Sequence, residues 1–218
     1  MERSHQIPAI DRRRLKAQLP RWVVALIVLC CLVEAYLTFV PLTEGAPSRA
    51  VAFAAGGFWS QLVWGAKGVY PGQGIVMFAT YGLLHSGLMH LAMNMISLAA
   101  VGRELKRLIG SGWMAVSYVI SQIAAAALFA VMEPNAGPMV GASGAIFGLA
   151  GTLVGYAGVV GYRRSRPLGP LWRGVITLLV LNVALTVLMP SIAWQAHVGG
   201  ALAGLVIGGL LGLRPARR

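Results

Sequence analysis

Charged residues are scarce in this chain of 218 residues: Asp, Glu, Lys and Arg make up 11% of it, and only six residues are acidic. A soluble domain carries roughly a quarter charged residues, so the composition excludes an ordinary soluble enzyme. Hydrophobic residues make up 57% of the chain, and the mean hydropathy is +0.73. Intrinsic disorder requires low hydrophobicity and is excluded as well. The class that remains is a polytopic membrane protein.

Cysteine is rare, and the two cysteines, Cys30 and Cys31, are neighbours in an apolar run. Adjacent residues do not readily form a disulfide, so we interpret both as small apolar side chains. A metal site formed by His85, His90 and His197 is disfavoured, because no cysteine or carboxylate joins them and the spacing is not that of an HExxH zinc motif. We therefore expect neither a metal nor an organic cofactor.

Apolar windows of about 20 residues are long enough to cross a bilayer as helices. Six such windows lie at about 22–42, 76–101, 113–132, 139–160, 171–190 and 193–213. They predict an all-α domain of six transmembrane helices over residues 22–213, with a large outer loop between the first and second spans. Residues 1–21 are a basic leader without the apolar core of a cleaved signal peptide, and residues 214–218 are a short basic tail.

The positive charges alternate between the predicted connections. One side of the six-span arrangement holds 16 of the 18 cationic residues: Arg3, Arg12, Arg13, Arg14, Lys16, Arg21, Arg103, Lys106, Arg107, Arg163, Arg164, Arg166, Arg173, Arg214, Arg217 and Arg218. The other side holds Arg49 and Lys67. By the positive-inside rule, both termini are cytoplasmic. The net charge of +12 then reflects membrane topology and not a nucleic-acid partner. The excess of Arg over Lys fits a bacterial protein, and therefore a location in the plasma (inner) membrane.

Costly polar side chains occur near the outer ends of three predicted spans. The second span carries His85, His90 and Asn94, the fourth opens with Gly141, Ser143 and Gly144, and the sixth carries His197. At 1.5 Å per residue, Ser143 and His197 lie about 5–10 Å below the outer surface. Polar groups within spans usually face a cavity or a partner helix. We therefore expect all three groups to share one water-accessible cavity.

Helical spacing predicts that Ser143 meets His197. In the sixth span, His197, Gly200 and Gly204 share one face, and small residues in the fourth span line the face near Ser143. Such residues allow two helices to approach closely. A serine beside a histidine base is the minimum arrangement for nucleophilic catalysis. A serine in a span commonly donates to its own i−4 carbonyl, and a lone histidine in a span commonly has only a packing role. The catalytic interpretation therefore depends on three features together: the shared depth of the two residues, the presence of a partner, and the glycines on the facing helices.

Residues in the second span are candidates for stabilising an oxyanion. His90 and Asn94 are four residues apart and point the same way, and the backbone N–H of Ser143 lies at the start of a helix. His85 lies about 140° from His90 around the same helix.

These motifs together resemble the rhomboid family of intramembrane serine proteases. The resemblance rests on HxxxxHxxxN (His85, His90, Asn94), GxSG (Gly141, Ser143, Gly144) and AHxxGxxxG (Ala196, His197, Gly200, Gly204). It covers about residues 20–213 in the basic six-span form. It implies a Ser143–His197 dyad without an acidic third member, an oxyanion hole formed by His90, Asn94 and the Ser143 backbone N–H, and a supporting role for His85 and the motif glycines.

The resemblance also implies a substrate: a single-span membrane protein, cut near the outer surface of the bilayer. This chain departs from the family at Phe147, where tyrosine is common and stacks on the catalytic histidine, and in lacking a Trp-Arg pair in the outer loop. A rhomboid-like protein that binds transmembrane helices without cutting them is the first alternative, although such proteins usually lose the serine or the histidine. A channel or transporter would more commonly show inverted repeats. Glu34, within the first span, we interpret as structural.

Overall fold

The computed structural model describes residues 18–40, 48–165 and 193–215, together with isolated positions between 167 and 180. Its described residues form helices and no strands, apart from one bridge between Phe58 and Met139. The long helices are α1 (Arg21–Phe39), α5 (Leu88–Met132), α6 (Ser143–Arg163) and α8 (Trp194–Leu213). All four are long and apolar enough to cross a membrane. The first, fourth and sixth predicted windows correspond to α1, α6 and α8, with ends that differ by a few residues.

The helix α5 contains both the second and the third predicted windows. Its 45 residues would extend about twice the thickness of a bilayer core if they were straight. The backbone leaves the helical conformation at Gly110, with φ of 81° and ψ of 165°, so two helices meet there. This break lies in the polar connection that the sequence places between the two windows.

The predicted start of the second span, at residue 76, is wrong. The chain forms the short helix α4 (Gln73–Thr80) and the 3-10 turn η3 (Tyr81–Leu83), and α5 begins only at Leu88. Gly87, just before α5, has a φ of 117°, which interrupts a right-handed helix. Hydropathy could not reveal this break, because the residues on both sides of it are apolar. Most of the predicted fifth span, at 171–190, and most of the basic leader lie outside the described residues.

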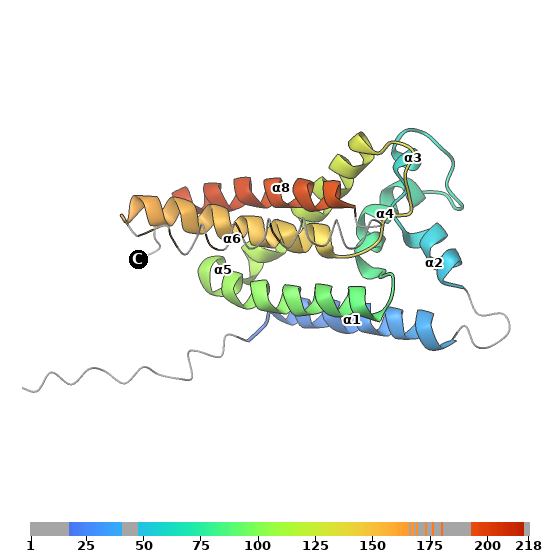
Figure 1. Cartoon of the computed structure of the whole chain (residues 1–218), viewed down its shortest axis with the longest axis horizontal. Coiled ribbons are helices and arrows are strands. Elements are labelled where there is room, and N and C mark those ends of the chain that lie inside the picture. The colour runs from blue at the N-terminus through green and yellow to red at the C-terminus, as the bar shows by residue number, and fades with distance from the viewer. Residues whose placement is uncertain are drawn as a thin grey trace, which may run out of the picture.

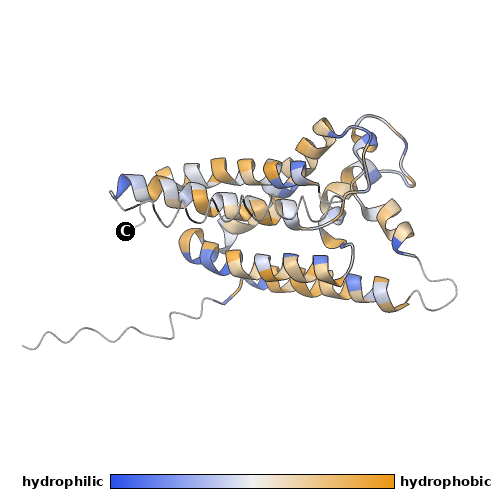
Figure 2. Cartoon of the chain, in the orientation of Figure 1, coloured by the Kyte–Doolittle hydropathy of each residue, from blue (hydrophilic) through white to orange (hydrophobic). Residues whose placement is uncertain are grey.

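In Figure 1 α1, α6, α8 and the first part of α5 run along one direction, with α6 beside α8 and α1 beside the first part of α5, whereas the second part of α5 runs obliquely to them. Hydrophobic residues follow these helices, and hydrophilic residues gather at their ends and in the connections (Figure 2). Leu32, Val119 and Val206 are more than half exposed, which is expected of a surface that contacts lipid. A Cβ atom on Gly200 or Gly204 would overlap a carbonyl oxygen of α6, so α6 and α8 pack at a distance that requires glycine.

The connection between α1 and α4 packs against the bundle. It contains α2 (Arg49–Gly56) and α3 (Ser60–Val63), which lie with α4 at one end of the molecule (Figure 1). Phe58 is fully buried, and its ring contacts the rings of Phe78, Tyr81 and Phe129. The segment between α2 and α3 that carries Phe58 is therefore anchored by contacts with the protein.

Glu34 of α1 is fully buried and forms an ion pair with Arg49 of α2. The guanidinium binds the carboxylate in two places, with Nη2 at 2.7 Å from Oε1 and Nη1 at 2.9 Å from Oε2. The bond to Glu34 raises the pKa of Arg49. Arg49 Nη1 also donates to the carbonyl oxygen of His85 at 2.6 Å. The pair therefore joins α1, α2 and the segment before α5.

Candidate active site

Ser143 and His197 come together at the starts of α6 and α8. The Ser143 hydroxyl oxygen lies 2.8 Å from Nε2 of His197, although the two residues are 54 positions apart. His197 is 3% exposed, and its Nδ1 has no hydrogen-bond partner among the described residues. The Phe147 ring stacks on the imidazole with the ring centroids 4.3 Å apart and the planes 13° from parallel. The imidazole is thus held in one plane with its Nε2 directed at a hydroxyl.

A cavity of about 640 Å³ opens beside this pair. Its lining residues come from α2, η3, α5, α6 and α8, and from the segments that directly precede α5, α6 and α8. Ser143, His197, His90 and Asn94 all line it, so the structure brings these four residues to one space. Met93, Phe129, Met139 and Ile146 give much of the remaining wall an apolar character.

His90 and Gly141 lie against each other beside Ser143, in the wall of the cavity. Gly141 has a φ of 122°, and a Cβ atom built on it would lie 2.9 Å from Nε2 of His90 and 3.8 Å from Oγ of Ser143. Both the backbone conformation and the available room therefore require glycine. On the other side of the His90 ring, Nδ1 lies 2.9 Å from Oγ of Ser86 and accepts from the Ser86 backbone N–H at 3.4 Å.

Asn94 and the first turn of α6 supply further N–H groups. The Asn94 side chain is buried, and its Nδ2 donates to the carbonyl oxygen of His90 at 2.9 Å. One of the two amide hydrogens is engaged in that bond, which leaves the second available. Ser143 is the first residue of α6, so its backbone N–H has no acceptor within the helix.

A family model for the rhomboid domain matches residues 72–214, about two thirds of the chain. The chain belongs to the rhomboid family. Its family membership and its long apolar helices make it a multi-pass membrane protein. The three motifs that carried the resemblance all lie within the matched residues.

Several curated rhomboids are similar to this chain. The Bacillus subtilis "Rhomboid protease GluP" is 32% identical over 131 residues, which cover 60% of this chain and 25% of that protein. The Arabidopsis thaliana "RHOMBOID-like protein 5" is 34% identical over 133 residues, which cover 61% of this chain and 42% of that protein. The Saccharomyces cerevisiae "Rhomboid protein 1, mitochondrial" is 31% identical over 134 residues, which cover 57% and 38% respectively. The match therefore spans less than half the length of each of these relatives.

His85 of this rhomboid lies outside the cavity wall. It precedes α5, its ring is fully buried, and it packs edge-on against the His90 ring with 5.2 Å between centroids. Its carbonyl oxygen accepts the bond from Arg49. The structure therefore places His85 behind His90, between that ring and the ion pair of Arg49 and Glu34.

Sequence reasoning gave no site role to four polar residues that line the rhomboid cavity: Ser86, Ser97, Glu133 and Gln195. Ser86 stands four positions before His90, a spacing that identifies neighbours on a helix, although here the contact forms across the start of α5. Glu133 was visible as an isolated acidic residue between the third and fourth predicted spans. Gln195 carries no signal of its own, because its partner Glu133 is 62 residues away.

Proposed function

We propose that this rhomboid is an intramembrane serine endopeptidase that cleaves transmembrane proteins near the outer membrane surface. The observation that supports it best is the 2.8 Å separation between Oγ of Ser143 and Nε2 of His197 at the wall of the cavity. A nucleophile and its base need this distance for proton transfer during attack. The proposed substrate is a single-span membrane protein, and the reaction needs no metal or organic cofactor.

The proposed reaction is acyl transfer in two steps. His197 Nε2 takes the Ser143 proton as the hydroxyl oxygen attacks the scissile carbonyl carbon, and the carbonyl π electrons move onto its oxygen. Collapse of this intermediate breaks the C–N bond, and the leaving amine takes the proton from His197. Water, deprotonated by His197, then attacks the acyl-enzyme and releases the new carboxylate with a free Ser143 hydroxyl.

The oxyanion formed in each step requires donors directed at the space beside Ser143. His90 Nε2 lies beside Gly141 and close to Ser143, and Asn94 and Ser143 line the same cavity. Preorganised donors of this kind stabilise the charge as it develops. Phe147 assists by stacking on His197, which restricts rotation of the imidazole between its two proton transfers.

The proposed topology is the basic six-span form over residues 22–213. The charge alternation along the chain supports it, with both termini cytoplasmic, a large outer loop between the first and second spans, and the predicted fifth span at 171–190 included. The non-helical backbone at Gly110 within α5 supports the assignment of two spans to this segment. This orientation sets the Ser143 end of α6 toward the outer surface of a bacterial plasma membrane.

Reconstituted full-length protein tests the proposal directly. Wild type, Ser143→Ala and His197→Ala are incubated in liposomes with a fluorescent single-span reporter protein, and cleavage is followed by electrophoresis. Each substitution is expected to lower the rate by about 10³-fold or more. Ser117→Ala is the matched control, because Ser117 is a buried span residue that bonds its own i−4 carbonyl at Trp113. Binding of the reporter without cleavage by wild type would overturn the proposal and favour a catalytically silent rhomboid.

A further inference from the structure

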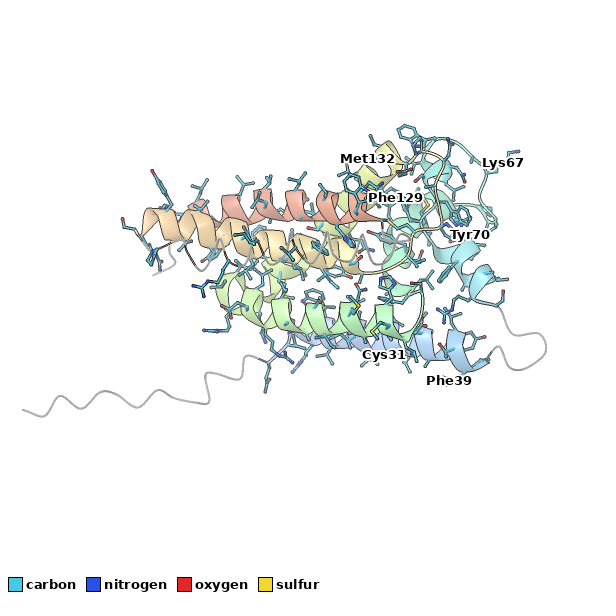
Figure 3. All side chains as sticks on the ribbon, viewed as in Figure 1. Cys31, Phe39, Lys67, Tyr70, Phe129 and Met132 are labelled. Atoms are coloured by element: carbon cyan, nitrogen blue, oxygen red, sulfur yellow. The ribbon has the colours of Figure 1, made fainter. Side chains whose placement is uncertain are left out.

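The cavity beside Ser143 holds one carboxylate. Of all the described residues that line the cavity, Glu133 is the only Asp, Glu, Lys or Arg. It follows the last turn of α5, on which Figure 3 labels Phe129 and Met132. Its side chain is exposed, so a molecule entering the cavity from this end can approach it.

Gln195 fixes this carboxylate relative to the candidate base. The Gln195 amide Nε2 donates to Oε1 of Glu133 at 2.8 Å, and Gln195 is 7% exposed. Gln195 lies two residues before His197 in the first turn of α8. The carboxylate is therefore tied to the same helical turn that carries the imidazole.

No cation neutralises Glu133 within the part of the chain that the structure describes. The ion pairs there join Arg49 with Glu34 and Arg107 with Glu104. Glu133 also follows the C-terminal end of α5, where free carbonyl groups carry partial negative charge. The corner of the cavity between α5 and α8 is therefore negative, while the rest of the described wall is apolar or uncharged.

We propose that Glu133 is a specificity-determining residue that favours substrates with a lysine or arginine close to the scissile bond. This inference rests on the proposed protease function and names a property of its substrates. A cationic side chain that reaches the α5–α8 corner gains a charge partner, whereas an acidic side chain is repelled. Because Glu133 is exposed, solvent screens the interaction, and a preference of about two- to fivefold is expected for lysine over glutamine.

A purely structural role for Glu133 predicts a different result. In that case the carboxylate only accepts the Gln195 bond and steadies the start of α8. Glu133→Gln separates the two roles, because a glutamine oxygen still accepts from Gln195 while the charge is lost. Charge-dependent selectivity then disappears although the bond remains.

The test uses the full chain in phosphatidylcholine liposomes, whose lipids carry no net charge. A single-span reporter carries lysine, glutamine or glutamate, one substitution at a time, at each position flanking its cleavage site. Values of kcat/KM are measured for wild type, Glu133→Gln and Glu133→Lys, at low and high salt. Glu104→Gln is the matched control, because Glu104 is exposed and ion-paired but lies outside the cavity.

At one or more positions, wild type and Glu104→Gln are expected to prefer lysine to glutamate. Glu133→Gln should remove the preference, Glu133→Lys should reverse it, and high salt should weaken it in the wild type. Equal lysine-to-glutamate ratios in wild type and Glu133→Gln at every position would overturn the proposal. If Glu133→Gln does not fold, the salt dependence of the wild type decides instead. A wild-type ratio of kcat/KM for the lysine and glutamate reporters that is the same at low and high salt would also overturn the proposal.

The two proposals fail in different ways. One outcome is that wild type cleaves the glutamine reporter while Ser143→Ala does not, with the same lysine-to-glutamate ratio of kcat/KM in wild type and Glu133→Gln. In that case only the role of Glu133 is wrong. If wild type cleaves none of the reporters, or Ser143→Ala cleaves them equally well, the protease function is wrong and the specificity inference fails with it.

Discussion

Ser86 contacts the Nδ1 atom of His90 twice, through its hydroxyl at 2.9 Å and through its backbone N–H at 3.4 Å. A backbone N–H can only donate, so Nδ1 acts as an acceptor. A neutral imidazole has one acceptor and one donor nitrogen, which places the proton on Nε2. That nitrogen lies beside Gly141 and close to Ser143. Ser86 therefore positions His90 as a hydrogen-bond donor at the point where the proposed mechanism needs one.

Ser86→Ala is expected to lower kcat with little change in KM. The substitution removes the hydroxyl but keeps the backbone N–H, so His90 loses one of its two restraints. A typical hydrogen bond contributes about 0.5–1.5 kcal/mol, which corresponds to about a two- to tenfold loss. Steady-state cleavage of a single-span reporter measures both constants. Ser86→Thr retains the hydroxyl and should recover most of the rate; equal rates for wild type and Ser86→Ala would contradict the positioning role.

Gly204→Ala is expected to destabilise the protein through the contact between α6 and α8. A Cβ atom there would overlap the carbonyl oxygen of Gly148, so the two helices must separate. Overpacking of this kind costs about 1–3 kcal/mol. Gly209→Ala, on the same helix, is the matched control, because its Cβ would have only Val159 Cγ2 as a neighbour, at 4.0 Å.

Unfolding in mixed detergent micelles, followed by circular dichroism, compares the two variants. The expected order of stability is wild type close to Gly209→Ala, with Gly204→Ala well below both. Equal unfolding midpoints for the two variants would show that α6 and α8 are not in close contact at Gly204.

Glu34→Gln is expected to weaken the fold while leaving proteolysis within a few-fold of wild type. Glu34 is fully buried but does not line the cavity, and it acts on Arg49. Loss of its charge removes part of a charge-assisted pair, at a cost of about 1–3 kcal/mol in the free energy of unfolding. Unfolding midpoints and reporter cleavage are measured on the same preparations. Complete loss of cleavage by a folded Glu34→Gln protein would show instead that Glu34 takes part in the site.

Arg49→Gln provides the companion measurement. Since Glu34 and Arg49 bind each other, the double variant should lose less stability than the sum of the two single variants. Strict additivity would mean that the ion pair contributes little of its own.

Much of the site was foreseeable because its residues belong to short segments with fixed helical spacing. The faces formed by Ser143 with Phe147, and by His197 with Gly200, follow from 3.6 residues per turn. The polar clusters lie near the outer ends of the second, fourth and sixth predicted spans, and this position predicts one common depth in the membrane. The roles assigned to Ser143 and His197 in catalysis stay predictions, whereas their proximity is a property of the structure.

Other features could not be read from the chain because they depend on backbone path or on distant partners. The window 76–101 is apolar on average, and its few polar residues also occur in continuous spans, so mean hydropathy could not show that the helix breaks between Leu83 and Leu88. The partner of Glu34 lies 15 residues away, across residues without a regular pattern. The Glu133 carboxylate is fixed by a glutamine that only the packing of α8 brings near it.

Composition and periodicity by themselves determined that this protein lies in a membrane as a helical bundle. A soluble fold of 218 residues has too small a core to bury so much apolar surface. They also determined which side chains share a helical face. Tertiary structure alone decided where the second span begins, how the His90 ring is oriented, and which carboxylates face a cation. Those outcomes depend on contacts of a few ångströms between segments that are far apart in sequence, and local spacing carries no information about them.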